Sequence, residues 1–268
     1  MSDTQSPLFR PVADLMRRVA AEVILPRYQH LDAKDIEEKA KDDLVTIADK
    51  ESELRLSEGL ADLLPEAHIL GEEACAANPA LLDTAGTGLV WIIDPIDGTG
   101  NFAAGRAPFG VMIALCDAGE TLEGWLLDPL TGRLCHACKG AGASLDGTPL
   151  RARESGAALP IAGISTLFLP GDEREDIERR TAGRMTMVPI PRCAAEQYPR
   201  LALGTNDVAL FHRTLPWDHA PGALILNEAG GRVARFDGTP YRVGTKETGM
   251  LGAASPAMWD KTAAIMFG

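Results

Sequence analysis

The sequence lacks any apolar run near the roughly 20 residues that a membrane span needs. Its first 20 residues also lack the apolar core of a signal peptide. Lys and Arg are in deficit, 26 against 38 Asp and Glu, so the formal net charge is −12. Nucleic acids and acidic membranes select clustered basic residues, so we expect neither as a partner. A soluble cytoplasmic protein is the expectation.

Cysteine is sparse, with five residues at positions 75, 116, 135, 138 and 193. An odd number without framework-like spacing predicts reduced thiols. Cys135-His136-Ala137-Cys138 has no second ligand pair, so it is interpreted as ordinary strand residues, with a metal or redox site as the open alternative. Repeats, low-complexity tracts and long linkers are also missing. The 268 residues, 46% hydrophobic, suffice for one large domain or two closely packed halves.

The chain is organised around an apolar run that leads into two carboxylates. Trp91 to Ile93 predicts a short buried strand, which Asp94-Pro95 is expected to end because proline cannot donate to the sheet. Asp97 follows, and then Gly98 and Thr99, whose backbone N–H groups can approach an anion. Carboxylates beside anion-binding amides require a cation between them. This combination predicts a Mg²⁺-dependent phosphate site.

Three further acidic signals accompany this stretch. Asp49 ends a β-prone run at a predicted helix start, and Asp218 opens an apolar helix after a tryptophan. Each could serve only as a helix cap. Glu72 and Glu73 follow a short strand and could be a solvated pair. Their joint occurrence with Asp94 and Asp97 favours a shared site.

Periodicity and turn signals predict a layered α/β chain with an antiparallel meander in its middle. The expected helices cover residues 7–25, 48–64, 171–182, 197–203 and 217–229. The expected strands cover residues 68–70, 91–93, 110–116, 121–127, 134–139, 142–145, 160–166, 185–190 and 208–211. Residues 26–43 are charged and weakly periodic, and we expect an exposed helix or loop there.

The acidic motifs resemble those of the inositol monophosphatase family of Mg²⁺-dependent, Li⁺-sensitive phosphatases. That family includes fructose-1,6-bisphosphatases, histidinol-phosphatases and 3′-phosphoadenosine nucleotidases. The matching motifs, in the family's order, are Asp43-Leu44-Val45-Thr46 with Asp49, Gly71-Glu72-Glu73, Asp94-Pro95-Ile96-Asp97-Gly98-Thr99 with Asn101-Phe102, Trp217-Asp218 with Ala220 and Gly222, and Glu228-Ala229-Gly230-Gly231.

The resemblance implies an α/β (α+β) fold of alternating αβαβα layers. It implies an α+β half over residues 1–152 with most metal ligands, and an α/β half over 153–268 with Asp218 and the substrate-specificity segments. These form one compact unit, and a homodimer is common in the family. The resemblance implies two or three Mg²⁺ ions. Their ligands would be Glu72, Asp94, the Ile96 carbonyl, Asp97 and Asp218. Asp49, Thr99 and Glu72 resemble the residues that activate the attacking water.

Substrate contacts are implied for Gly98, Thr99, Arg192, Ala195 and Glu196. Two departures concern the substrate. Phe211 stands where inositol-specific members carry a Glu that binds a sugar hydroxyl, and a small-residue pair after Arg192 is lost. Residues 163–169 and 192–200 are expected to select the leaving group.

The expected function is therefore hydrolysis of a small phosphate monoester by a metal-activated water, without a covalent intermediate. The phosphate is that of an inositol or a related sugar or polyol. Histidinol phosphate, fructose bisphosphate and nucleotide 3′-phosphates are alternatives on the same metal core. A haloacid-dehalogenase mechanism is disfavoured because Pro95 and Ile96 separate the two Asp residues by one residue too many. A catalytically silent regulatory relative is the alternative of another class.

Overall fold

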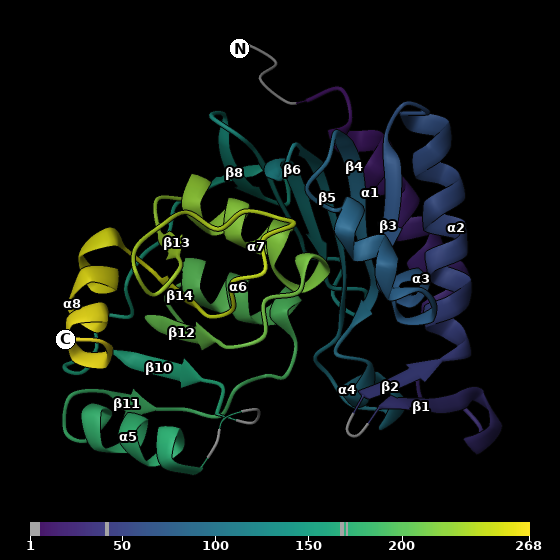
Figure 1. Ribbon diagram of the computed structural model, residues 1–268. Helices are drawn as coiled ribbons and strands as arrows, with labels where there is room; N and C mark the ends of the chain where they lie inside the picture. Colours follow the sequence, from purple (N-terminus) through teal and green to yellow (C-terminus); the bar gives the residue numbers. More distant parts are fainter. Residues whose placement is uncertain (1–5, 41–42, 167–168, 170) are drawn as a thin grey trace.

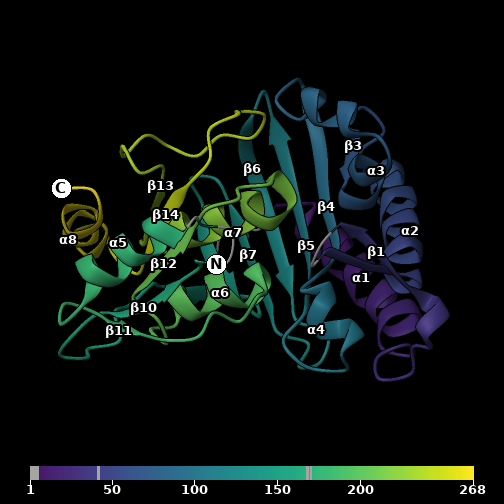
Figure 2. The ribbon, with the colours of Figure 1, turned by 60° about the horizontal axis from the view of Figure 1, so that its bottom comes forward.

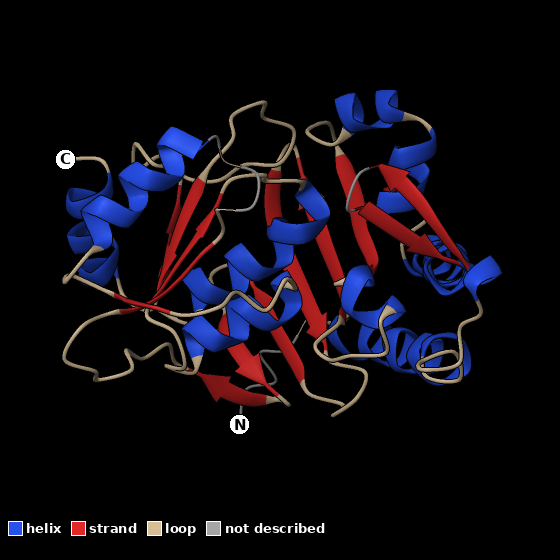
Figure 3. Cartoon of the chain, turned by 90° about the horizontal axis from the view of Figure 1, so that it is seen from below, coloured by secondary structure: helices blue, strands red, loops and turns tan. Residues whose placement is uncertain are grey.

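The computed structural model describes residues 6–40, 43–166, 169 and 171–268, and it is built in five layers (Figure 1). Two long helices form the first layer: α1 (Phe9–Val19), which continues as a π-helical turn over Ala20–Ile24, and α2 (Ile47–Leu63). A seven-stranded sheet, two central helices, a five-stranded sheet and two outer helices follow. The predicted αβαβα layering is confirmed, and Figure 3 shows the alternation of helices and sheets from below.

The seven-stranded sheet contains the antiparallel meander that the sequence predicts. Its spatial order equals its chain order: β3 (His68–Gly71), β4 (Leu89–Asp97), β5 (Gly110–Asp117), β6 (Glu120–Leu127), β7 (Leu134–Cys138), β8 (Gly142–Leu145) and β9 (Thr148–Leu150). Only β3 and β4 are parallel, and the other neighbours are antiparallel. Helices α1 and α2 cover one face, and α6 (Ala194–Ala202) and α7 (Pro216–Glu228) cover the other. Both faces are covered, which fits the continuous apolar runs over residues 89–93 of β4 and 110–116 of β5.

The five-stranded sheet has the order β11 (Thr186–Met187), β10 (Ile161–Ile164), β12 (Val208–Phe211), β14 (Met250–Ala253) and β13 (Arg232–Ala234). Strands β10, β11 and β12 run parallel, and β14 is antiparallel to both β12 and β13. Helices α5 (Gly171–Thr181) and α8 (Pro256–Met266) lie outside this sheet (Figure 2). The strands β13 and β14 and the helix α8 follow the last element predicted from the sequence.

The central helices pack closely because small residues face them. Gly222 of α7 lies against the ring of Tyr198 on α6, and a Cβ at Gly222 would be 2.0 Å from Tyr198 Cδ2. Gly124 on β6 faces Pro221 of α7, where a Cβ would come within 2.8 Å of Pro221 Cα. The apolar core between the two sheets is therefore close-packed at the start of α7.

One expected strand boundary is wrong. Strand β4 does not end at Asp94-Pro95 but continues to Asp97, which pairs with Gly110 on β5. The register shifts between Asp94 and Asp97, because Pro95 has no N–H for the ladder and the chain bulges there. Bulges re-aim side chains, and this one lies between the two carboxylates.

The expectation for residues 26–43 is also wrong in part. The described residues form a 3₁₀ turn (Ala33–Asp35) and a strand, β1 (Ile36–Ala40), that pairs with β2 (Asp43–Thr46). Strand β1 was not predicted because its side chains are mostly charged and do not alternate between apolar and polar. A two-stranded ribbon can form without such alternation. Positions 41–42 lie outside the described residues. Of the expected strand over 185–190, only Thr186–Met187 is regular.

The remaining expectations concern domains, cysteines and membranes. The first sheet ends at Leu150 and the second begins at Ile161, so the boundary at residues 152/153 stays a prediction that fits between them. The five cysteines are unpaired thiols. Cys135 and Cys138 belong to β7 as interpreted. Among the described helices, none is long and apolar enough to span a bilayer.

Candidate active site

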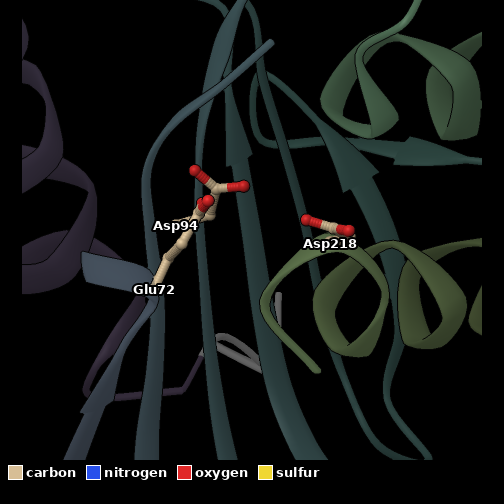
Figure 4. Close-up of side chains that lie close together, drawn as sticks. All are labelled: Glu72, Asp94 and Asp218. Carbon is tan, nitrogen blue, oxygen red and sulfur yellow. The ribbon is translucent and has the colours of Figure 1, made fainter. Parts of the chain in front are cut away.

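Three carboxylates from distant parts of the chain meet in one cleft. Glu72, Asp94 and Asp218 each offer an oxygen, and these atoms lie within 4.8 Å of one another. In Figure 4, Glu72 and Asp94 come from the sheet side and Asp218 faces them from α7. The cleft has a volume of about 510 Å³ and is also lined by Asp97 and Thr99.

Asp94 is positioned by the bulge of β4. Its Oδ1 accepts a hydrogen bond from the Ile96 N–H at 3.1 Å, and its side chain is 1% exposed. Asp97 lies three residues after Asp94, where its Oδ2 accepts from the Ala195 N–H at 2.6 Å. Asp97 is therefore in the cleft but outside the three-carboxylate group. Its hydrogen bond ties the start of α6 to the end of β4.

Glu72 is the first residue of α3 (Glu72–Ala77), and Glu53 on α2 holds this helix start. The Glu53 carboxylate accepts hydrogen bonds from the N–H groups of Glu73 at 2.7 Å and Ala74 at 2.8 Å. It thereby caps α3. A Cβ at Gly71 would lie 2.2 Å from Glu53 Cδ, so only glycine fits there. Sequence reasoning missed Glu53, although the glycine before Glu72 signals a close approach.

Lys39 on β1 is a second residue that sequence reasoning missed. Its Nζ donates to Glu72 Oε1 at 2.9 Å and to Glu73 Oε1 at 3.0 Å. Burial lowers the pKa of Lys39, but Glu72 and Glu73 raise it more, so the ammonium stays charged. A cation therefore already contacts one member of the carboxylate group. No spacing rule connects Lys39 to Glu72, because the two are joined only by the fold.

Asp218 lies in the first turn of α7, as expected, and its neighbour His219 anchors that turn. His219 Nε2 lies 2.9 Å from the Arg213 carbonyl, and Nδ1 lies 2.9 Å from Tyr198 Oη. Burial lowers the pKa of His219 to about 4, so the ring is neutral at pH 7. Because a carbonyl only accepts, Nε2 carries the proton and Nδ1 accepts from Tyr198.

Asp49 and Thr99 are joined as a pair. The Thr99 hydroxyl lies 3.1 Å from Asp49 Oδ1 and 2.9 Å from the Ile96 carbonyl, and its single proton can be donated to either. Asp49 Oδ2 accepts from the Thr46 N–H and hydroxyl at 2.8 Å and 2.6 Å, completing a capping box at α2. Asp49 therefore caps a helix and also reaches the cleft residue Thr99.

Gly98 provides the turn between β4 and α4 (Thr99–Ala103). Its φ of +84° is in the left-handed region, which favours glycine. A Cβ there would lie 3.1 Å from the Pro108 carbonyl and 3.2 Å from Cys193 Cβ. Both Gly98 and Thr99 line the cleft, and the backbone N–H groups at this turn suit an anion.

The carboxylates crowd one another in a buried place, and their pKa values respond. Burial, followed by Glu72 and Asp97, raises the pKa of Asp94 well above its usual range. Burial raises the pKa of Asp97 and of Asp49 to about 6 each, and burial with Glu72 raises that of Glu73 to about 7. A divalent cation bound among these carboxylates would offset their mutual repulsion and favour their ionised form. The residues present therefore fit Mg²⁺.

The expected substrate residues divide into two sets. Gly98, Thr99 and Arg192 line the cleft, while Ala195 and Glu196 are not among its described lining. Ala195 is buried with its N–H on Asp97, and Glu196 pairs with Arg133 at 2.5 Å and Arg200 at 2.7 Å. Both residues hold the start of α6 in place.

The specificity segments reach the cleft in part. Gly163, Ser165, Cys193 and Gln197 line it, whereas positions 167–168 lie outside the described residues. Phe211 also lines it, with its ring 5.2 Å from that of Tyr198 and 4.8 Å from that of His219. The wall at residue 211 is therefore aromatic.

Five alternating layers with an acidic cleft between the sheets define a phosphatase of the layered α/β type. The sequence profile of the inositol monophosphatase family matches residues 5–266, and the chain belongs to that family. It is 33% identical over 208 residues to an inositol-1-monophosphatase of Bacillus subtilis, covering 74% of this chain and 75% of that protein. The enzyme class predicted from the sequence, a phosphoric monoester hydrolase, is confirmed.

Two other relatives show the breadth of the family. The Nus factor SuhB of Pseudomonas aeruginosa is 31% identical over 231 residues, covering 83% of each chain. The solved structure of an IMPase of Thermotoga maritima superposes with a TM-score of 0.78 at 25% identity, covering 95% of this chain and 94% of that one. The fold is thus shared over nearly the whole chain, while the relatives carry names that refer to different functions.

Proposed function

We propose that the protein hydrolyses a small phosphate monoester, an inositol phosphate or a related sugar or polyol phosphate, in a Mg²⁺-dependent reaction. The observation that carries this proposal is the meeting of Glu72, Asp94 and Asp218 within 4.8 Å, in the cleft that Thr99 also lines. Carboxylate oxygens are the ligands that Mg²⁺ prefers. The Thr99 hydroxyl and the Asp49 carboxylate, which lie 3.1 Å apart, can together orient and deprotonate a water molecule.

Two or three Mg²⁺ ions would be held by five residues: Glu72, Asp94, the Ile96 carbonyl, Asp97 and Asp218. When bound there, the metal supplies a lowered water pKa and neutralises phosphate charge. The N–H groups of Gly98 and Thr99 bind the phosphate oxygens. Asp94, Glu72 and Asp218 would hold the metal together, since each offers an oxygen within 4.8 Å of the others.

The protein residues order and deprotonate the attacking water. The Thr99 hydroxyl and the Glu72 carboxylate hold the water in line with the ester bond. Asp49, whose pKa burial raises to about 6, takes the proton through Thr99 or directly. The water oxygen bonds to phosphorus, the bond to the leaving-group oxygen breaks, and that oxygen gains a proton. No covalent phosphoenzyme forms.

The other properties proposed follow from the same site and from the charge of the chain. We expect millimolar Li⁺ to inhibit the enzyme, since a small cation competes for the same oxygens. The partner is a small phosphorylated metabolite rather than nucleic acid, consistent with a net charge of −12. A cytoplasmic homodimer is part of the proposal.

Alternative substrates share the metal core. Histidinol phosphate, fructose 1,6-bisphosphate and nucleotide 3′-phosphates remain candidates, and a relative from Aquifex aeolicus is named fructose-1,6-bisphosphatase/inositol-1-monophosphatase. A catalytically silent regulatory protein is the second candidate, because several relatives are named Nus factor SuhB. The complete Asp49–Thr99 pair favours the enzyme.

The test is phosphate release from a panel of monoesters with purified protein. We expect release with Mg²⁺, none with EDTA, and restoration when Mg²⁺ returns. Trapping after acid quench should recover no phosphoprotein. A protein that binds Mg²⁺ but hydrolyses nothing in the panel would favour the silent alternative, and a trapped phosphoenzyme would overturn the mechanism.

A further inference from the structure

Two arginine side chains that line the cleft have no acidic partner among the described residues. Arg106 and Arg192 are both exposed, and both belong to the cleft lining. Within the part of the chain that the structure describes, neither guanidinium has a hydrogen bond or an ion pair. Other arginines, such as Arg133 and Arg200, are held by Glu196. Arg213 also lines the cleft, but it already has an interaction within the protein. Arg106 and Arg192 are thus the two guanidinium groups that the described cleft lining leaves without a partner.

Asn101 fixes the two loops that carry these arginines. Its Nδ2 donates to the Pro108 carbonyl at 2.8 Å and to the Pro191 carbonyl at 3.0 Å. The N–H of Arg106 returns to the Asn101 carbonyl at 2.9 Å. Asn101, which follows the turn that is proposed to bind the phosphate, therefore holds both loops: its side chain bonds Pro108 and Pro191, and its carbonyl accepts from Arg106.

Arg192 is held in an unfavourable backbone conformation. Its φ of +53° lies in the left-handed region, which residues with a Cβ rarely adopt. The following residues keep it there: Cys193 Sγ approaches the Asp97 carbonyl at 3.7 Å, and the Ala195 N–H is bound by the Asp97 carboxylate. Strain of this kind is retained where the position of a side chain has a use.

The carboxylates of the proposed metal site and the turn at Gly98 already have proposed roles, so the two arginines are available to bind the leaving group. Two Mg²⁺ ions would balance the four carboxylates of Glu72, Asp94, Asp97 and Asp218. The turn at Gly98 supplies N–H donors for the transferred phosphate. At position 211 the wall of the cleft is the ring of Phe211, which offers a sugar hydroxyl no hydrogen-bond acceptor. Arg106 and Arg192 add two guanidinium donors that match planar acidic groups.

We propose that Arg106 and Arg192 form a second anion subsite, so that preferred substrates are monoesters whose leaving group carries another acidic group. This inference rests on the proposed phosphatase function and names its substrate class. A second phosphate and a carboxylate present the same chemistry to a guanidinium. The subsite binds the part of the substrate that is not transferred, and the reaction itself is unchanged.

The test compares matched substrates. One pair is fructose 1-phosphate and fructose 1,6-bisphosphate, and the other is glycerol 3-phosphate and 3-phosphoglycerate, each with Mg²⁺. We expect kcat/KM to favour the diacid at least tenfold, and Arg106→Gln or Arg192→Gln to lose about tenfold of that preference, as for one charge-assisted hydrogen bond. The loss should appear mainly in KM. A preference in the fructose pair alone identifies a second phosphate, and one in both pairs identifies any acid.

Arg18→Gln on α1, an exposed arginine outside the cleft lining, is the matched control and should keep the full preference. Equal kcat/KM within both pairs would overturn the inference while leaving the phosphatase function intact. So would variants that lower kcat equally for every substrate, since the arginines would then serve the transferred phosphate. If no substrate is hydrolysed, the proposed function fails instead. In that case, calorimetry measures the binding of fructose 1,6-bisphosphate to the wild type and to both variants. Weaker binding by the variants supports the subsite, and equal binding overturns it.

Discussion

Lys39 Nζ lies 2.9 Å from Glu72 Oε1, so an ammonium occupies part of the coordination space of a proposed metal ligand. The side chains are only 15% and 16% exposed, so the pair is shielded from bulk water. The same ammonium contacts Glu73 at 3.0 Å. The β1–β2 ribbon thereby delivers a fixed positive charge to the edge of the acidic site. That charge opposes a divalent cation at Glu72.

Replacing Lys39 with methionine keeps the length of the side chain and removes its charge. We expect the affinity for Mn²⁺ or Mg²⁺ to rise by about tenfold. An electrostatic interaction that shifts a pKa by one unit is worth about 1.4 kcal/mol, which corresponds to a factor of ten in affinity. Direct titration without substrate measures this. Lys50→Met is the control, because Lys50 is an exposed lysine that pairs with Glu37. Unchanged or weaker metal affinity in Lys39→Met would contradict the expectation.

Asp94→Asn should abolish hydrolysis while the protein still folds. The amide can still accept from the Ile96 N–H, but it no longer neutralises a cation. We expect a loss in kcat of about 10³-fold or more, on the scale of removing an electrostatic stabiliser of the transition state. The melting temperature without Mg²⁺ should not fall, because a buried carboxylate beside Glu72 is removed. Thermal shift with and without Mg²⁺ checks this, and a Mg²⁺-induced shift as large as in wild type would disprove it.

The hydroxyl of Thr99 is expected to matter for kcat and not for folding. Thr99→Val keeps the shape and removes the group between Asp49 and the Ile96 carbonyl. We expect kcat to fall by about 10²–10³-fold, within the usual range for general-base catalysis. Thr99→Ser retains the hydroxyl and should recover most of the rate. Equal loss in both variants would point to packing rather than the hydroxyl.

The metal-free protein should lose stability as pH rises. Burial raises the pKa of Asp49 and Asp97 to about 6, and that of Glu73 to about 7. In the unfolded chain these groups ionise near pH 4, so between about pH 4 and 7 the folded state binds more protons. Its extra stability is complete below pH 4 and is lost by about pH 7.

Melting curves in EDTA from pH 4.5 to 7.5 measure this slope. Mg²⁺ favours the ionised carboxylates, so the melting-temperature gain that it produces should grow over the same interval. Glu73→Gln removes one titrating group and should flatten the slope without metal. A melting temperature in EDTA that increases steadily with pH would show that the carboxylates are not strained as described.

Local spacing within one turn could be interpreted from the sequence. The apolar run before Asp94 predicts a buried strand, and Gly98 is expected to let backbone N–H groups approach an anion, which fits the turn that it forms there. The sequence allows Asp49 to be a helix cap, and Asp49 does contribute to the cap of α2, as the third helical residue in a capping box with Thr46. These features depend on residues a few positions apart, where backbone geometry alone decides the outcome.

Other features depended on partners far away in the chain. The strand continues past Pro95 because Gly110 of β5 still pairs with Asp97. Ala195 serves Asp97 through its backbone N–H, which no residue type reveals. Glu53 caps α3 from a neighbouring helix, and its own sequence surroundings resemble any charged helix face.

By itself the sequence determined which carboxylates are available and the order in which they come along the chain. Only the tertiary structure decided that Asp218 meets Glu72 and Asp94, and that Lys39 stands beside them. The reason is that α7 packs across β4 to β7, so side-chain distances between remote segments are set by sheet order and helix contact. Neither quantity is written in the spacing of residues along the chain.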